Sequence, residues 1–291
     1  MQFFSLGSNS RIVYADLTDT ISLINAIQTS KPDYVFSLAA QSYPLTSFES
    51  PIDTYNTNIL GTARLLKAFR KLKLDPVIYI CASSEVFGKV AKEKRPLKED
   101  CNFHPASPYA ISKIGTDLLG RYHAEAYNQK VLTTRMFTHT GPRRGDVFAE
   151  SSFAKQIAMI EEGLIEPIVK VGNLDSLRTY ADVRDAVDAY YTLVTVNPIP
   201  GEYYNIGGSH ITTIRDVLNT LLSMSPKKDE IEIVIDQSRL RPIDADLQIP
   251  DMTKFKNHTG WESKIPFEQT MKDLLDYWRE KISMGQKALQ R

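Results

Sequence analysis

The sequence predicts an α/β fold in which a doubly wound parallel sheet is followed by a smaller lobe of mixed helices and strands. Short apolar runs alternate with segments of helical periodicity up to about residue 140. The apolar runs are nearly continuous, which is typical of parallel strands that are buried on both faces. After Pro142 the regular alternation is lost, and this change indicates where the second lobe begins.

The first part of the chain places strands and helices in the order that such a sheet requires. We expect strands at residues 11–15, 33–40, 77–83 and 131–137. We expect helices between them at residues 18–29, 51–72 and 108–128. The run at 77–83 is almost wholly apolar, and in the helix at 51–72 apolar residues recur at helical spacing.

The second part of the chain has a mixed order of elements. We expect helices at residues 148–162, 182–196, 212–224 and 266–282, and short strands at residues 168–171, 203–206 and 231–235. Thr212 is a candidate cap for the helix that begins there. A lobe of this kind is expected over the C-terminal ends of the parallel strands, where such sheets bind ligands.

The composition excludes several classes of function. Lys plus Arg and Asp plus Glu both total 35, and this balance argues against nucleic acid or a membrane surface as the main partner. The chain has no run of 18 apolar residues and no N-terminal signal pattern. Only Cys81 and Cys101 are present, and neither the cysteines nor the histidines have metal-ligand spacing. We therefore expect a cytoplasmic protein without a metal site.

Tyr109 and Lys113 are the clearest sign of chemistry in the sequence. They are four residues apart in a predicted helix that begins at Pro108, so the phenol and the ammonium share a face. A neighbouring ammonium favours the phenolate and lowers a tyrosine pKa from about 10 towards working pH. Such a phenol can exchange a proton with a sugar hydroxyl while a hydride moves. The preceding strand ends in Ser83-Ser84-Glu85, which supplies a serine to hold that hydroxyl.

This combination resembles the extended short-chain dehydrogenase/reductase superfamily, in its nucleotide-sugar branch, over nearly the whole chain. The resemblance implies a Rossmann-like sheet and NAD or NADP as cofactor. It implies that Ser83, five residues before Gly88, is the active-site serine and that Lys113 holds the cofactor ribose. The further cofactor-binding positions that the resemblance implies are Asp16 and Leu17 beside the adenine, Leu38, Ala39 and Ala40 beside the nicotinamide, and Arg143 on a loop that reaches the cofactor.

Glu85 narrows the resemblance to the sugar 4,6-dehydratases, because Ser83-Ser84-Glu85 is similar to the Thr-Ser-Glu of the GDP-mannose type. After hydride leaves C4 for NAD(P)⁺, the new ketone acidifies the C5–H bond. A nearby carboxylate can take that proton and help to expel the C6 hydroxyl as water, and the hydride then returns to C6. The resemblance implies that Ser84 assists near C6. The alternative is a glutamate that only caps or pairs at the strand end.

Arginines and their neighbours in the second lobe resemble the segments of this family that contact GDP. An arginine fork can bind two diphosphate oxygens at once. The resemblance implies that Arg178 and Arg241 bind the diphosphate and that Asp244 binds the ribose hydroxyls; surface ion pairs are the alternative for the arginines. The segment that contains Asn173 is also implied to contact GDP, and Thr138 stands where the family has an asparagine that contacts the sugar phosphate.

Other segments depart from the dehydratase pattern. Gly201–Gly208 and the run from Thr259 to Pro266 are more similar to the GDP-4-keto-6-deoxymannose reductases. We therefore expect an NAD(P)-dependent 4,6-dehydratase of a GDP-sugar such as GDP-mannose. A reductase of the 4-keto sugar, or another C4 oxidoreductase or epimerase, is the alternative. NAD versus NADP and the identity of the sugar stay open. By resemblance, we expect a homodimer or homotetramer.

The N-terminal region lacks the turn that binds a pyrophosphate in dinucleotide-binding sheets. Such sheets begin with a strand, a glycine-rich turn and a helix, and nothing before Asp16 fits this pattern. We expect that about 40–50 residues, one βαβ unit or slightly more, are missing; a truncated gene model, an omitted segment and an authentically short protein stay open. This gap raises a third hypothesis, a non-catalytic subunit that binds a sugar nucleotide.

The expected division into domains follows the same reasoning. Residues 1–140, with residues 180–210 returning to them, are expected to form an incomplete dinucleotide-binding domain. Residues 141–179 and 211–291 are expected to form the lobe that binds the sugar nucleotide.

Overall fold

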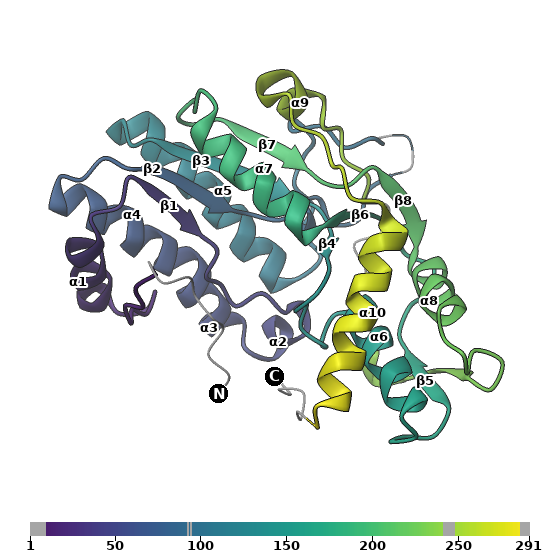
Figure 1. Cartoon of the computed structure of the whole chain (residues 1–291). Coiled ribbons are helices and arrows are strands. Elements are labelled where there is room, and N and C mark those ends of the chain that lie inside the picture. Colours follow the sequence, from purple (N-terminus) through teal and green to yellow (C-terminus); the bar gives the residue numbers. More distant parts are fainter. Residues whose placement is uncertain (1–9, 92, 94, 241–247, 286–291) are drawn as a thin grey trace.

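A four-stranded parallel sheet forms the centre of one part of the molecule (Figure 1). The computed structural model describes residues 10–91, 93, 95–240 and 248–285. The strands of this sheet, in spatial order, are β1 (Tyr34–Ser37), β2 (Val77–Cys81), β3 (Val131–Met136) and β7 (Tyr203–Ile206). All three neighbouring pairs are parallel. The predicted α/β fold with a parallel sheet is confirmed.

Helices cover both faces of this sheet. On one face, Ile78 and Ile80 of β2 share an apolar core with α1 (Thr20–Ser30), α4 (Gly61–Leu72) and α5 (Pro108–Tyr127). On the opposite face, Tyr79 shares a core with α7 (Val183–Thr195) and α9 (Thr253–Thr259). Successive residues of a strand point to opposite faces, so a strand buried on both sides has to be apolar throughout. This requirement explains the near-continuous apolar run at β2.

A continuous helical stretch precedes β2 and contains a π-helical turn. It comprises α3 (Pro51–Tyr55), the turn Asn56–Leu60 and α4. The i→i+5 bonds of such a turn accommodate one extra residue, and π turns occur frequently at functional sites. The turn places Asn58 in a buried position, with 2% of its surface exposed, against α5.

Helix α5 is capped at both ends by residues that suit their positions. The Ser107 side chain accepts a hydrogen bond from the Ala110 N–H at 3.0 Å, and Pro108 occupies the first turn, where it loses no hydrogen bond. Asn128 ends the helix in the left-handed conformation, with φ of 56°. The long helix between these caps carries both Tyr109 and Lys113 on its buried side.

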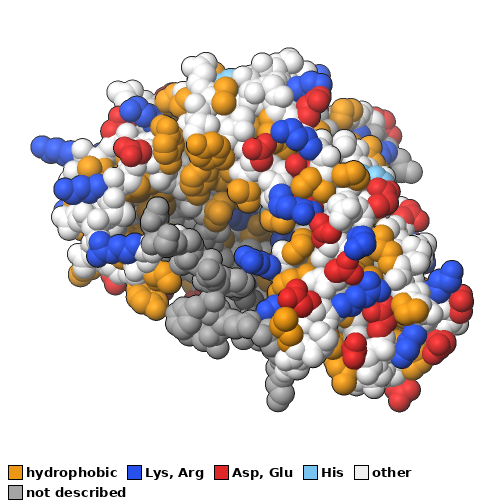
Figure 2. Space-filling model, in the orientation of Figure 1, with side chains coloured by type: hydrophobic (Ala, Val, Ile, Leu, Met, Phe, Trp, Pro, Cys, Tyr) orange, Lys and Arg blue, Asp and Glu red, His pale blue; other side chains and the backbone are white. Residues whose placement is uncertain are grey.

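Two smaller sheets lie in the other part of the molecule, around a separate apolar core (Figure 1). The first contains β4 (His139–Thr140), β6 (Leu177–Asp182) and β8 (His210–Thr213), and the second contains β5 (Ile168–Val171) and β9 (Glu232–Ile235). Three helices share this core: α6 (Ala149–Glu161), α8 (Ile214–Ser223) and α10 (Phe267–Ser283). On the face shown in Figure 2, acidic and basic side chains are interspersed over this part.

The structure corrects several expectations about individual elements. Residues 11–15 form no strand, and their apolar side chains Ile12, Val13 and Tyr14 are exposed rather than packed. The helix expected from Thr212 begins at Ile214, because Thr212 belongs to β8 and the side chain of Thr213 provides the cap. The short elements α2 (Pro44–Glu49), β4, β6, β8 and α9 were not predicted.

Among the described residues, no helix is long and apolar enough to cross a membrane. The same part of the chain contains no group of three or more His, Cys, Asp or Glu side chains that could hold a metal ion.

Candidate active site

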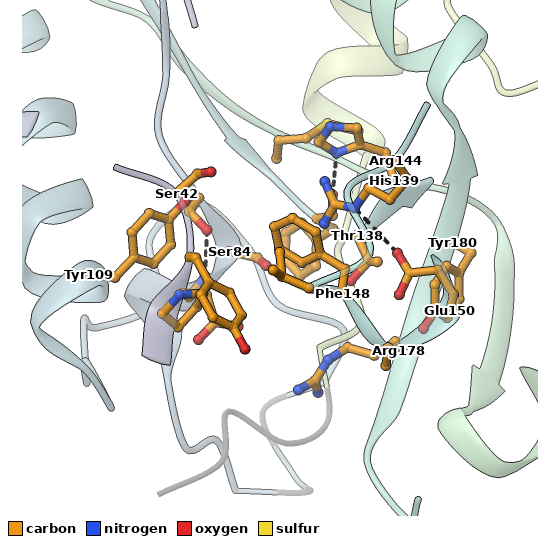
Figure 3. A pocket seen from close by; sticks show the side chains of 18 of the residues that line it. Ser42, Ser84, Tyr109, Thr138, His139, Arg144, Phe148, Glu150, Arg178 and Tyr180 are labelled. Carbon is orange, nitrogen blue, oxygen red and sulfur yellow. Dashed lines mark hydrogen bonds and ion pairs between the residues drawn. The ribbon is translucent and has the colours of Figure 1, made fainter. Parts of the chain in front are cut away.

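A cavity of about 890 Å³ is lined by residues from both parts of the molecule. Residues at the carboxyl ends of β2 and β3, and residues of α5, line it on one side. Residues of α6 and β6 line it on the other side. Parallel sheets bind ligands at the carboxyl ends of their strands. Figure 3 shows Tyr109 and Ser84 on one side of the cavity and Glu150, Arg178 and Tyr180 on the other.

The turn after β2 presents Ser83, Ser84 and Glu85 to the cavity. Ser83 caps a short 3₁₀ helix, Ser84–Phe87, and its hydroxyl accepts a hydrogen bond from the Glu85 N–H at 3.2 Å. The turn closes at Gly88, whose φ is 54°. A Cβ atom at Gly88 would lie 1.6 Å from the His104 carbonyl oxygen, so only glycine fits here.

Tyr109 lies against this turn. Its phenol lies near the Ser83 hydroxyl, which lowers the pKa of the phenol, and its backbone N–H donates to the Ser47 hydroxyl of α2 at 3.0 Å. Burial raises the pKa of Tyr109 above the ordinary value for tyrosine, and the nearby Cys81 and Glu85 raise it further.

Lys113 is buried one turn along α5, with 6% of its surface exposed. Its ammonium donates to the Cys81 carbonyl oxygen at 2.7 Å and lies 5.8 Å from the centre of the Tyr109 ring. Burial lowers the pKa of Lys113. Although a lower value was expected, burial keeps the pKa of Tyr109 above the ordinary value for tyrosine, because it outweighs the lowering by Arg144.

Asn58 joins the loop after β1 to helix α5. Its side-chain amide donates to the Ser112 hydroxyl at 2.8 Å and to the Gln41 carbonyl at 3.0 Å, and its oxygen accepts from the Gln41 N–H at 2.9 Å. Leu38 and Ala40, which precede Gln41, line the cavity. The side chain of Asn58 thus links this loop by hydrogen bonds to the helix that carries Tyr109 and Lys113.

The model for a family described as GDP-mannose 4,6 dehydratase matches residues 3–274. The chain belongs to this family. A GDP-6-deoxy-D-mannose reductase of Pseudomonas aeruginosa is 31% identical over 251 residues, which are 86% of this chain and 82% of the relative. GDP-mannose 4,6 dehydratase 2 of Arabidopsis thaliana is 34% identical over 272 residues, which are 91% of this chain and 71% of the relative.

A solved structure supports the same family. The structure of RMD from Pseudomonas aeruginosa complexed with NADPH has a TM-score of 0.84 and 30% sequence identity. The match covers 95% of this chain and 90% of that chain. The resemblance to the nucleotide-sugar branch of the extended short-chain dehydrogenases/reductases is confirmed, and with it the prediction of an enzyme of this type.

The structure brings most of the predicted dehydratase-family site residues into one cavity. Its walls include the predicted residues Ser83, Ser84, Glu85, Tyr109, Lys113, Leu38, Ala40, Thr138, Asn173 and Arg178. Arg143 lies beside it, in the wall of an adjoining cavity of about 740 Å³ that shares Ala40 and Arg144 with the first. Arg241 and Asp244 lie outside the described residues.

Three of the predicted cofactor residues are absent from the walls of both cavities. Ala39 is exposed between Leu38 and Ala40. Asp16 accepts hydrogen bonds from the Thr18 N–H and hydroxyl at 2.7 Å, and these bonds lower the pKa of Asp16. Leu17 packs at Gly61, where an added Cβ would lie 2.8 Å from the Leu17 side chain. Asp16 and Leu17, which were predicted beside the adenine, thus lie outside the cavity that has Lys113 and Ala40 in its wall.

Residues that sequence reasoning missed make up much of the opposite wall. The Arg144 guanidinium lies 3.4 Å from the centre of the Phe148 ring, and its Nε lies 3.4 Å from Glu150 Oε1. His139 is close enough to Arg144 that burial and the arginine charge lower the pKa of His139 to about 4. Tyr180 and Arg239 also line this wall. Glu150 resembles an ordinary acid in the first turn of a helix, so the sequence does not distinguish it.

Proposed function

We propose that this chain is an NAD(P)-dependent 4,6-dehydratase of a GDP-sugar such as GDP-mannose. One observation carries the proposal: Ser84 and Glu85 line the same cavity as Ser83, Tyr109 and Lys113. Oxidation of a sugar alcohol at C4 needs only Ser83, Tyr109 and Lys113 of this set. A carboxylate in the same cavity adds a base for the C5 proton, and dehydration requires such a base.

In the proposed mechanism, Tyr109 takes the proton of the C4 hydroxyl, and the Ser83 hydroxyl, which lies near the phenol, holds the C4 oxygen. A nicotinamide cofactor, when bound, supplies the acceptor and donor of the hydride. Lys113 would hold the ribose of that cofactor without giving up its bond to the Cys81 carbonyl, because an ammonium has three donors. Leu38 and Ala40 would border the nicotinamide.

Glu85 is the proposed base for the second step. It removes the proton at C5, the C6 hydroxyl leaves as water, and Ser84 assists that departure. The elimination removes one proton and one hydroxide from the sugar, and the return of the hydride to C6 with a proton to C5 then leaves no net change in the cofactor. The position of both side chains in the 3₁₀ turn supports this assignment, because the turn directs them into the cavity next to Ser83.

The proposed carrier is GDP. Arg178 lines the cavity on β6 and would bind the diphosphate, with Asn173 and Thr138 as further contacts. Arg241 and Asp244 are proposed for the diphosphate and the ribose, although both lie outside the described residues. The relatives named for GDP-sugars support this choice.

A direct test incubates the purified chain with GDP-mannose and NAD(P)⁺. Product mass and cofactor absorbance are followed together, and the expected result is loss of one water from the sugar without net cofactor reduction. Glu85→Gln is expected to abolish dehydration, whereas Glu125→Gln, on the exposed side of α5, is the control that leaves it unchanged. Dehydration that survives Glu85→Gln would show that the proposed mechanism is wrong.

The second candidate is a reductase of a GDP-4-keto-6-deoxy sugar, or another C4 oxidoreductase or epimerase of a GDP-sugar. The P. aeruginosa reductase at 31% identity favours it. A reductase would oxidise one NAD(P)H for each keto sugar, and its activity would survive Glu85→Gln. Incubation with the 4-keto sugar and NADPH distinguishes the two candidates by steady loss of absorbance.

Three broader proposals accompany the function. The separate apolar cores around the parallel sheet and around α6, α8 and α10 support the proposed division at residues 1–140 with 180–210 and at 141–179 with 211–291, except that α9 packs in the core of the parallel sheet. Cys81 and Cys101 are both free thiols, which is compatible with the proposed cytoplasmic location. Sedimentation of the purified chain tests the proposed homodimer or homotetramer.

A further inference from the structure

A buried glutamine links the turn that carries Glu85 to the strand that carries Arg178. The Nε2 of Gln248 donates to the Gly88 carbonyl oxygen at 3.3 Å. The backbone N–H of Gln248 donates to the Leu177 carbonyl oxygen at 3.2 Å, and the same residue forms a parallel bridge with Arg178 of β6. Gly88 closes the turn after β2, so Gln248 contacts the elements that carry both cavity residues.

The backbone around Gln248 has anchors of its own. The Leu97 N–H donates to the Ile249 carbonyl oxygen at 2.8 Å, and the Asp251 N–H donates to the Leu97 carbonyl oxygen at 2.7 Å. Together with the bond to β6, these bonds hold the segment in place whatever side chain stands at position 248. The side chain of Gln248 therefore adds one specific contact, the bond to Gly88, to a segment that is already fixed.

This contact holds the far end of the turn that carries Glu85. The Ser83 hydroxyl caps the start of the turn, and the His104 N–H donates at 3.0 Å to a carbonyl in its middle. At its end, the Gly88 N–H donates to the Glu85 carbonyl oxygen at 3.1 Å, and the Gly88 carbonyl accepts from Gln248. Loss of the glutamine amide would leave the turn folded but remove its tie to β6.

Stability alone does not account for a glutamine at this position. Gln248 is 1% exposed, and among the described residues its Oε1 has no hydrogen-bond partner. An unpaired buried oxygen is costly, whereas a neutral hydrogen bond adds little, and 3.3 Å is long for such a bond. An apolar side chain of similar size would avoid that cost. The amide therefore contributes position rather than stability.

We propose that Gln248 is a positioning residue for the elimination step, because it fixes the separation across the cavity between Glu85 and Arg178. Figure 3 shows Arg178 across the cavity from Ser84 of the same turn. The inference rests on the proposed function, in which Arg178 holds the diphosphate and Glu85 takes the C5 proton. The sugar lies between these two groups, so their separation determines whether C5 reaches the carboxylate.

The proposal concerns one step of the reaction and not the other. Tyr109 and Lys113 of α5 serve the oxidation at C4, whereas Gln248 bonds to the turn and to β6 and does not line the cavity. A small displacement of Glu85 slows removal of the C5 proton and leaves hydride transfer from C4 fast. Reduced cofactor then accumulates during turnover, because the hydride returns to C6 only after water has left.

The test follows a single turnover of GDP-mannose with saturating NAD(P)⁺ by stopped-flow absorbance of the reduced cofactor. Gln248→Leu removes the donor at similar volume. Its rate of cofactor reduction is expected to stay within about twofold of the wild type, while reoxidation becomes about tenfold to a hundredfold slower. Calorimetry with GDP is expected to give a dissociation constant within about twofold of the wild type.

Gln129→Leu is the matched control. Gln129 is also a buried glutamine, its Nε2 donates to the Leu66 carbonyl oxygen at 3.1 Å, and it lines neither cavity. Both phases are expected to keep their wild-type rates in this variant. The two rate constants belong to the folded enzyme, so a lower folded fraction does not change them. Gln248→Met, with a flexible apolar side chain, is the second variant if Gln248→Leu does not fold.

The outcomes separate this inference from the proposed function. If the wild type releases water but Gln248→Leu slows both phases equally, or neither, the inference is wrong and the function stands. If the wild type releases no water from GDP-mannose, the proposed function is wrong. Hydrogen exchange of residues 83–88 then decides the contact itself: exchange faster in Gln248→Leu than in the wild type supports it, and unchanged exchange would overturn it.

Discussion

The two sides of the cavity are built in different ways. Beside the parallel sheet, Tyr109, Lys113 and Asn58 are held by hydrogen bonds of 2.7 to 3.0 Å to backbone or hydroxyl groups of other elements. On the side of α6 and β6, Arg144 and Glu150 attract each other at 3.4 Å but leave buried polar atoms without hydrogen bonds. The first side is held by hydrogen bonds within the protein, whereas this pair on the second side is held by the attraction of opposite charges.

This difference matches the proposed division of labour. Groups that take part in proton transfer have to be held in position before the substrate arrives, because small displacements reduce the rate strongly. Groups that select a substrate gain most when their hydrogen bonds are completed by the correct ligand only. Substitutions on the sheet side should therefore change rate or stability, and substitutions on the α6 side should change affinity.

The largest expected effect is on the sheet side. Tyr109→Phe removes the proposed acid–base group and is expected to lower kcat about 10²- to 10⁴-fold, with GDP binding unchanged. Tyr122→Phe, at an exposed position of the same helix, is the control. Single-turnover measurements report the chemical step directly. A Tyr109→Phe variant that retained full activity would remove the tyrosine from the mechanism.

The next largest effect is expected on GDP binding, at the side of the cavity formed by α6 and β6. Arg178→Gln is expected to weaken binding of GDP about tenfold to a hundredfold, because a charge-assisted bond to the diphosphate is lost. Arg215→Gln provides the comparison, since Arg215 is an exposed arginine that pairs with Asp175 and does not line the cavity. Calorimetry with GDP measures both, and equal affinities for the two variants would contradict the assignment of Arg178.

A smaller effect, on stability, is expected from removing the Ser47 hydroxyl that contacts the start of helix α5. Ser47→Ala leaves the buried N–H of Tyr109 without its acceptor and should lower the free energy of unfolding by about 1–3 kcal/mol. Ser47→Thr, which keeps the hydroxyl, should recover most of the loss. Urea unfolding of the two variants and the wild type gives the values. No difference between alanine and threonine would mean that the hydroxyl does not support the helix.

The smallest effect is a dependence of stability on pH. The pKa of His139 in the folded protein is about 4, below the usual value of about 6.5, because burial and the charge of Arg144 disfavour its protonated form. Between these values the unfolded chain binds the proton more tightly, so the contribution of His139 is present above pH 6.5 and is lost as the pH falls towards 4. The loss is smaller than the roughly 3 kcal/mol that such a difference gives for a fully buried group, because the side chain of His139 is only partly buried. His139→Gln should flatten this part of a stability profile measured by urea unfolding.

The sequence predicted the sheet side of the site better than the opposite side, and there are physical reasons. Ser83, Tyr109 and Lys113 act through the end of one strand and one face of one helix, and both are visible as local patterns. Glu150 meets Arg144 only because α6 folds back against the loop before it. Arg239 reaches the same wall from residues far along the chain, where it donates to Ser152. Contacts of this kind leave no periodic signal.

Predictions of individual strands were wrong where the apolar content of a segment did not match its burial in the structure. The run at residues 11–15 has the composition of a strand, but Tyr14 is 82% exposed and the run pairs with no described strand. The strand β6 was missed because it combines Arg178, Thr179 and Asp182 with only a few apolar residues. Its residues pair with β8 and β4, so partners distant in the chain determine its conformation.

The π turn at Asn56–Leu60 sets the rotational phase of the helical stretch that precedes β2. Each residue of an α-helix advances the direction of its side chains by about 100°. Deletion of one residue within the turn would therefore rotate everything on one side of the deletion by that angle relative to the other. Either Asn58 would turn away from Ser112, or the apolar face of α4 would turn away from β2. Because of the extra residue in the π turn, the amide of Asn58 points to α5 while the apolar face of α4 packs against the sheet.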